Sequence, residues 1–136
     1  MHIVIEMIPH CSQRYNTVGD WQYKEYGSDE ILYIRVSNMT NPRFEWLVAR
    51  HELDEALLCK ARGITEKEVD SYDFSHPDAG SSDFDSNMDA PYYLEHCSAL
   101  ASEWQFAREL KIDWQSYTEE IQRLCDSYKY KDLEAK

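Results

Sequence analysis

The stretch "NPRFEWLVARHELDEALLCKARG", residues 41–63, decides the fold and raises the question of function. Asn41 is a favourable N-cap residue, and Pro42 suits the first turn of a helix. Gly63 is typical of the residue that follows a helix C-terminus. These signals predict one helix that runs from Pro42 to about Arg62.

The predicted helix carries polar residues where a core helix would carry leucine. Because successive residues turn by about 100°, one stripe holds Phe44, Leu47, Val48, His51, Glu55, Leu58 and Cys59. Trp46, Leu53 and Leu57 lie on the opposite side, which predicts a central helix covered by a sheet and by another helix. His51 and Glu55 are then buried one turn apart. A buried carboxylate is costly unless it is paired, hydrogen-bonded or bound to a cation.

The letters "HELDE", residues 51–55, follow the pattern H-E-x-x-H with Glu55 in place of the second histidine. In that pattern two helical side chains bind Zn²⁺, and the glutamate beside the first histidine activates a water molecule. His51 and Glu55 are therefore candidate zinc ligands, and Glu52 is the candidate general base. The alternative is a histidine–glutamate hydrogen bond that only orders the core, and so short a pattern leaves both interpretations open.

A second helix, predicted to be capped by Asp89 or Ala90 and to end near Lys111, repeats this feature. One of its faces holds Tyr92, His96, Ala99, Glu103, Phe106 and Leu110. If this face meets the first helix, His51, Glu55 and His96 form a three-ligand site. Glu103 is then a fourth ligand or a partner that orients a histidine. Three protein ligands are typical of catalytic zinc and four of structural zinc. The sequence favours Zn²⁺ without excluding other divalent metals.

The remaining patterns predict an α+β fold. Apolar, β-branched residues predict a strand over residues 2–8, and alternating residues predict a hairpin with strands 20–26 and 31–37. A third helix is expected to start at Asp113. We expect the whole chain, residues 1–136, to form a single domain with three helices packed on a small antiparallel sheet.

The segment between the first two helices is predicted to be mostly irregular. Residues 64–69 are consistent with a short turn or helix. Residues 70–89, "DSYDFSHPDAGSSDFDSNMD", are rich in Asp, Ser and Gly and show no apolar period. This composition predicts a long surface loop.

Charge and composition exclude several classes of function. The net charge of −12 argues against a basic groove for nucleic acid. No apolar run approaches the roughly 18 residues that a membrane span needs. The start "MHIVIEMIPH" lacks the basic region and cleavage site of a signal peptide, so a cytoplasmic location is expected. The four cysteines show no C-x-x-C spacing and are expected to be thiols.

The order of strand "ILYIRVS", capped loop and helix with "HELDE" resembles the core of the zincin metallopeptidases over residues 31–62. In that family an edge strand beside the active-site helix holds an extended peptide substrate. The resemblance implies a zincin-like core and a zinc-dependent, peptidase-like hydrolase with Glu52 as general base. The chain departs from the family at Glu55, and an anionic ligand there makes the metal a weaker Lewis acid.

Three segments, "IPHCSQRYNTVGDW", "RFEWLVARHELDEALLCKARGI" and "APYYLEHCSALASEW...ELKIDWQSY", resemble a family of small proteins of tailed phages and prophages. This resemblance implies a phage protein in the cytoplasm of an infected bacterium. It shares the motif positions His51, Glu52, Glu55, His96 and Glu103. A second class of function also fits the net charge: a non-enzymatic interaction protein that inhibits a host defence factor or mimics DNA. Its partner would be an unidentified protein or peptide that contacts the loop 70–89, and the His/Glu cluster would be structural.

Overall fold

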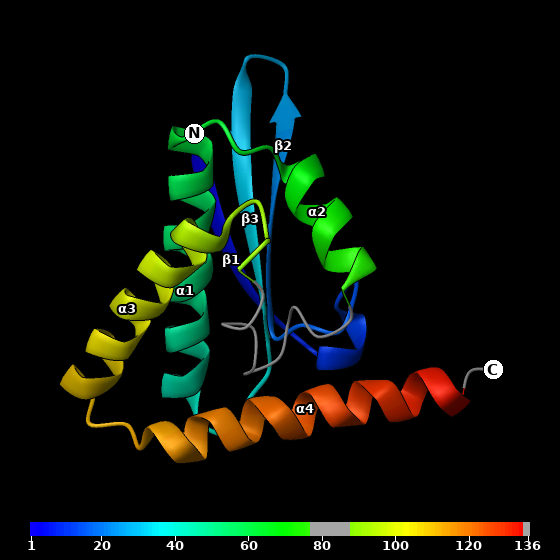
Figure 1. Ribbon diagram of the computed structural model, residues 1–136, viewed down its shortest axis with the longest axis vertical. Coiled ribbons are helices and arrows are strands. Elements are labelled where there is room, and N and C mark those ends of the chain that lie inside the picture. The colour runs from blue at the N-terminus through cyan, green and yellow to red at the C-terminus, as the bar shows by residue number, and fades with distance from the viewer. Residues whose placement is uncertain (77–87, 135–136) are drawn as a thin grey trace.

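The computed structural model describes residues 1–76 and 88–134, with side chains up to Tyr128. Three strands form one sheet, and four helices pack around one face and one end of it (Figure 1). The strands are β1 (His2–Ile8), β2 (Gly19–Tyr26) and β3 (Asp29–Ser37), and a 3-10 turn, η1, covers His10–Ser12. The helices are α1 (Pro42–Ala61), α2 (Glu66–Ser75), α3 (Tyr93–Glu109) and α4 (Trp114–Glu134). The prediction of an α+β fold is confirmed.

The sheet is mixed, with the strand order β1-β3-β2. The predicted hairpin is present, because β2 and β3 are antiparallel, but β1 runs parallel to β3. The prediction of an antiparallel sheet is therefore wrong for β1. The connection from β1 to β2 passes beyond the end of β3, where the carbonyls of Ile8 and Val18 accept hydrogen bonds from Asn38 and Ser37. This crossing places β1 and β2 on opposite sides of β3.

The core lies between β3 and α1. Leu32, Ile34 and Val36 alternate along β3, and each is fully buried on the face that meets the helix. Leu47 and Val48 are the matching buried residues of α1. The strand period of two and the helix period of 3.6 thus bring one apolar face of each element together.

Helix α1 follows its predicted boundaries closely. The side chain of Asn41 accepts a hydrogen bond from the backbone N–H of Arg43, and Gly63 has a φ of 74° after the helix. However, Trp46 is 47% exposed and Leu57 is 39% exposed, so the expectation of a helix covered on two opposite faces is wrong. The sheet and α3 cover adjacent sides of α1, and the third side faces solvent.

The chain has four helices in its described part, one more than predicted. Helix α2 begins after the N-cap Thr65 and includes residues 70–75, which were predicted to be loop. Val69, Tyr72 and Asp73 are its buried residues. Their spacing of three and four gives a short buried face that the acidic composition concealed. The rest of the predicted loop, residues 77–87, lies outside the described residues.

The last two helices start close to their predicted caps. Residues 88–92 form turns and a bend, so the N-cap of α3 is Tyr92, two or three residues after the predicted cap at Asp89 or Ala90. The side chain of Asp113 accepts a hydrogen bond from the backbone N–H of Ser116 at the start of α4. Among the described residues, every helix is too short or too polar to cross a bilayer.

Candidate metal centre

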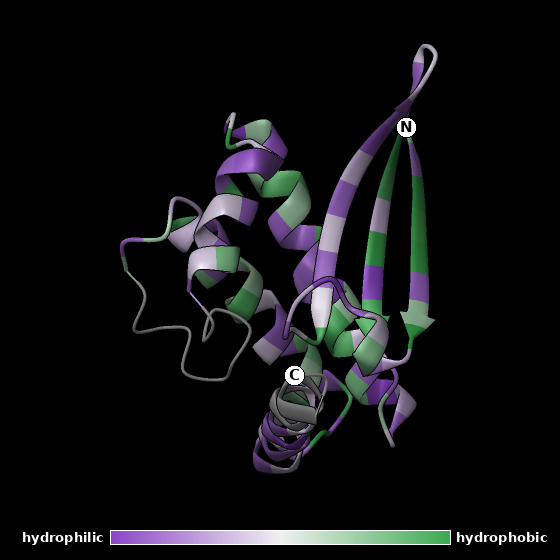
Figure 2. Cartoon of the chain, turned by 90° about the vertical axis from the view of Figure 1, so that its right-hand side faces the viewer, coloured by the Kyte–Doolittle hydropathy of each residue, from purple (hydrophilic) through white to green (hydrophobic). Residues whose placement is uncertain are grey.

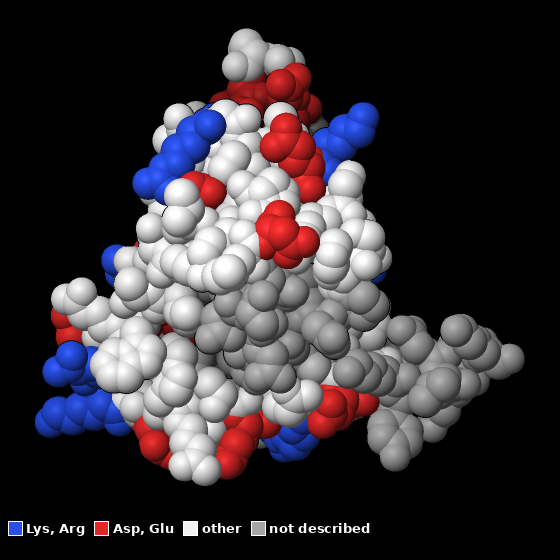
Figure 3. Space-filling view, in the orientation of Figure 1, with Lys and Arg blue, Asp and Glu red and all other residues white. Residues whose placement is uncertain are grey.

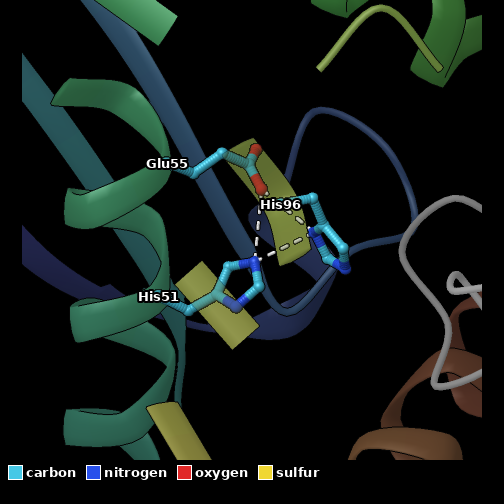
Figure 4. A group of neighbouring side chains, drawn as sticks. All are labelled: His51, Glu55 and His96. Atoms are coloured by element: carbon cyan, nitrogen blue, oxygen red, sulfur yellow. Dashed lines mark hydrogen bonds and ion pairs between the residues drawn. The ribbon is translucent and has the colours of Figure 1, made fainter. Parts of the chain in front are cut away.

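Three side-chain atoms from α1 and α3 converge on one point (Figure 4). Nε2 of His51 lies 3.2 Å from Oε2 of Glu55 and 3.2 Å from Nδ1 of His96. The third side of the triangle, from Nδ1 of His96 to Oε2 of Glu55, is 3.1 Å. A tetrahedral zinc ion with bonds of about 2.0–2.1 Å holds its ligands roughly 3.3 Å apart. The triangle therefore has the size of one face of a zinc coordination sphere, and the group could hold a metal ion.

The two helices position these ligands in a buried place. His51 and Glu55 lie one turn apart on α1, and both are buried. His96 lies in the first turn of α3 and is partly buried, with its ring centroid 4.7 Å from that of His51. Because α1 and α3 lie side by side, the His/Glu stripe of each helix meets the stripe of the other (Figure 1).

Glu103 holds His51 from the side opposite the triangle. Nδ1 of His51 lies 2.7 Å from Oε1 of Glu103, and Glu103 is itself buried. When Nδ1 donates its proton to Glu103, Nε2 of the neutral ring carries a lone pair directed at the carboxylate of Glu55. Two lone pairs at this distance repel each other unless a proton or a metal ion lies between them. Of its two predicted roles, Glu103 has the geometry of the orienting partner.

The charges of the cluster are strongly interdependent. Burial lowers the pKa of His51, but hydrogen bonds and charges from Glu103 and Glu55 raise it well above its usual value. Burial raises the pKa of Glu55, but hydrogen bonds from His51 and His96 lower it to about 2. Without a metal the cluster therefore holds a proton on His51 at neutral pH. A metal ion would take the place of that proton.

Trp21 on β2 completes the support of Glu55. Its indole Nε1–H donates a hydrogen bond of 3.2 Å to Oε1 of Glu55, which leaves Oε2 directed at the triangle. Trp21 is only 4% exposed, so its N–H needs a buried acceptor. Sequence reasoning missed this role, although a buried tryptophan on a strand beside the helix is a usable signal. Tyr117 of α4, which lies in the cavity wall with Glu103, was missed in the same way.

The ligands lie in the wall of a cavity of about 300 Å³. Its described lining comes from β2 and all four helices and holds seven acidic side chains and no Lys or Arg. Arg14, which is outside the lining, neutralises Asp20 at 2.7 Å and Asp70 at 3.1 Å. The remaining negative charge, together with aromatic walls such as Trp104 and Trp114, favours neutral or cationic occupants over anions.

Glu52, the predicted general base, lies in the same cavity wall beside His51. No hydrogen bond to Glu52 is found in the described part of the chain. Burial and the neighbouring charge of Glu55 raise the pKa of Glu52 well above its usual value. A carboxylate with a raised pKa is a stronger base than an ordinary glutamate, and without a fixed partner it is free to accept a proton from water.

Gly19 at the start of β2 leaves room for Glu52. A Cβ atom at Gly19 would lie 2.6 Å from Cγ of Glu52 and 2.7 Å from Cγ1 of Val48. We therefore expect Gly19→Ala to reduce the free energy of unfolding by about 1–3 kcal/mol through overpacking and to displace Glu52. Urea unfolding measures the first effect. The double variant Gly19→Ala with Glu52→Ala should recover part of the loss, and a Gly19→Ala variant as stable as the parent would contradict the close contact.

Asp73 of α2 is a second buried acid of the cavity. Its carboxylate accepts hydrogen bonds from the hydroxyls of Tyr15, at 2.8 Å, and of Tyr92. Burial raises the pKa of Asp73 to about 7, although both hydroxyls act in the opposite direction. Sequence reasoning placed Asp73 in a loop and missed it.

The pKa of Asp73 predicts a dependence of stability on pH. The folded protein keeps a proton on Asp73 up to about pH 7, whereas the unfolded chain releases it near pH 4. Stability is therefore lost as the pH rises from 4 to 7, by up to about 4 kcal/mol from this group. Asp73→Asn removes the group while keeping its shape. Urea unfolding with a chelator present should show the parent losing more stability than the variant between pH 4 and pH 8, and equal losses would contradict the raised pKa.

No protein-family model, curated protein or solved structure matches this chain. The resemblances to zincins and to a phage family therefore stay predictions, and a zincin-like core is not confirmed. The site rests on its geometry. Four of the predicted residues, His51, Glu55, His96 and Glu103, lie in direct contact, and Glu52 lies in the wall of the same cavity.

Proposed function

We propose that the protein is a zinc-dependent hydrolase in which His51, Glu55 and His96 bind the metal and Glu52 is the general base. One observation carries the proposal: three ligand atoms lie within 3.2 Å of one another in the wall of a cavity. Three protein ligands leave a coordination position for water or substrate, which is the pattern of catalytic zinc. The carboxylate that supports His51 is the usual companion of such a ligand.

Each residue of the cluster has a separate task in hydrolysis. Zn²⁺ bound here would polarise the substrate carbonyl and make a water molecule more acidic. Glu52 accepts the proton of the attacking water and returns it to the leaving group. Glu103 keeps His51 in the tautomer whose Nε2 faces the triangle, and Trp21 keeps Oε2 of Glu55 in place.

The charge of the cavity narrows the class of substrate. The carboxylates of the described lining that remain charged, in a wall without Lys or Arg, disfavour phosphate esters and acidic peptides. The aromatic lining offers π faces to an ammonium or guanidinium group. We therefore expect amide or ester substrates that are neutral or basic near the bond that is cleaved.

A defined peptide library tests this function. The zinc-loaded protein is incubated in ¹⁸O-water with mixed peptides that carry either Lys and Arg or Asp and Glu, and the products are read by mass spectrometry. The expected result is one ¹⁸O atom in the products of basic and neutral peptides, and no product when a chelator is present. A zinc-loaded protein that leaves the whole library intact would contradict the peptidase-like reaction.

The other predicted class, an acidic interaction protein, has less support. The surface it would use, residues 70–89, is only partly described, because residues 77–87 lie outside the described residues. On the face shown in Figure 3, described acidic side chains are scattered among uncharged and basic ones. A DNA mimic would instead need a continuous acidic track. The buried His/Glu cluster also has no task in such a protein beyond ordering the core.

A further inference from the structure

Strand β1 carries apolar side chains that no element covers in the described part of the chain. Ile3, Ile5 and Met7 are 47%, 45% and 40% exposed. In the sheet they lie beside Leu32, Ile34 and Val36 of β3, which are completely buried. These three β1 residues, the β1 strip, therefore belong to the apolar face of the sheet. Helix α1 packs mainly over β2 and β3.

One backbone edge of β1 pairs with no strand in the described part of the chain. The sheet order places β1 outermost, and Figure 2 shows it as the strand farthest from α2. The carbonyl of Ile8 accepts a hydrogen bond from Asn38, which follows β3, so the even-numbered residues of β1 direct their backbone groups at β3. Ile3, Ile5 and Met7 therefore direct their N–H and C=O groups outward. An open edge beside apolar side chains is a template for another strand.

We propose that a second copy of the chain occupies this edge, with the two β1 strands paired antiparallel about Val4. Antiparallel pairing about Val4 places Ile3 opposite Ile5 of the other copy, and these are residues whose backbone groups point outward. The same register places the exposed His2 opposite the exposed Glu6 of the other copy. A parallel pairing in register would instead bring the two Glu6 side chains together.

The size of the β1 strip fits this occupant. Each copy exposes roughly 250 Å² of apolar side chain from the three strip residues, and contact with the strip of the other copy across the new strand pair removes part of this area from water. A stable interface buries about 800 Å² per partner, so the paired backbone edges and flanking side chains would have to supply the remainder. A two-fold axis closes the assembly as one six-stranded sheet, because each copy contributes the same edge.

The test combines mass, a matched pair of substitutions and a cross-link. Each chain has a mass of 16.1 kDa. Light scattering at about 100 µM should give twice that mass, because a dimer with a Kd near 1 µM is almost fully formed at this concentration. Ile5→Lys should raise the dimer Kd by at least about 100-fold, because edge lysines block strand pairing. Leu57→Lys, which changes an exposed apolar residue of α1, is the control and should remain dimeric.

A cysteine at the axis keeps the test decisive if Ile5→Lys does not fold. In a Cys11→Ser background, Val4→Cys should form a cross-linked dimer under mild oxidation much faster than Lys24→Cys on the opposite edge strand. Facing residues of a non-hydrogen-bonded pair are about 4.5 Å apart between Cα atoms, which a disulfide can bridge. A parent chain that stays monomeric at about 100 µM, or equal cross-linking of the two cysteine variants, would overturn the proposal.

Discussion

Replacing His96 with alanine is expected to reduce the affinity for Zn²⁺ by more than about 100-fold. Removing a residue that only hydrogen-bonds to a metal ligand already lowers metal affinity by about 10–100-fold, and His96 is a ligand itself. His96 supplies one of three ligand atoms, and the remaining pair on α1 would have to hold the ion alone. Competition with a chromogenic chelator at pH 7.5 measures the two affinities. Glu103→Gln should give a smaller loss, because it weakens only the support of His51.

The matched control for this prediction is His10→Ala. His10 is also a buried histidine, 8% exposed, but it hydrogen-bonds to Ser37 and Asn16 at the end of β1, away from the cavity. Its removal can lower stability but should leave zinc affinity unchanged. Equal affinities of the parent and His96→Ala would show that zinc, if it binds, binds elsewhere.

Replacing Glu52 with glutamine is expected to reduce the rate of hydrolysis by about 10²–10⁴-fold with little change in zinc affinity, because a general base contributes about that factor. Glutamine has the shape of glutamate, so the close packing against Gly19 is kept. Its amide cannot accept the proton of water near neutral pH. The measurements are the steady-state rate on a basic peptide and the zinc affinity of the same preparation.

Glu66→Gln provides the comparison for Glu52→Gln. Glu66 is another carboxylate of the cavity, and its Oε2 accepts a hydrogen bond from the backbone N–H of Tyr23, 3.2 Å away. A glutamine there keeps an acceptor oxygen, so the rate should fall far less. An active Glu52→Gln variant would remove the general base from the mechanism, even if the metal site were real.

The local parts of the fold were predictable from the sequence. The cap at Asn41 and the stop at Gly63 are set within one turn of the chain, and the structure places α1 between them. The pairs His51/Glu55 and His96/Glu103 were found by helical period alone, because residues at these spacings share a face in any straight helix. The hairpin of β2 and β3 followed from short-range alternation in the same way.

The remaining parts depend on contacts distant in sequence. The parallel direction of β1 is set by a crossing beyond the end of β3, which no local pattern records. Helix α2 was missed because its buried face has only three residues within an acidic segment. Trp21 and Tyr117 reach the site from β2 and α4, so their roles follow only once the tertiary arrangement is known.

Anomalous diffraction from crystals soaked in Zn²⁺, with data collected on both sides of the zinc absorption edge, tests the central claim most directly. The account predicts one peak between α1 and α3, about 2.0–2.2 Å from Nε2 of His51, Oε2 of Glu55 and Nδ1 of His96. An empty triangle in a protein exposed to saturating zinc would contradict it, and the cluster would then be a proton held on His51 between two carboxylates.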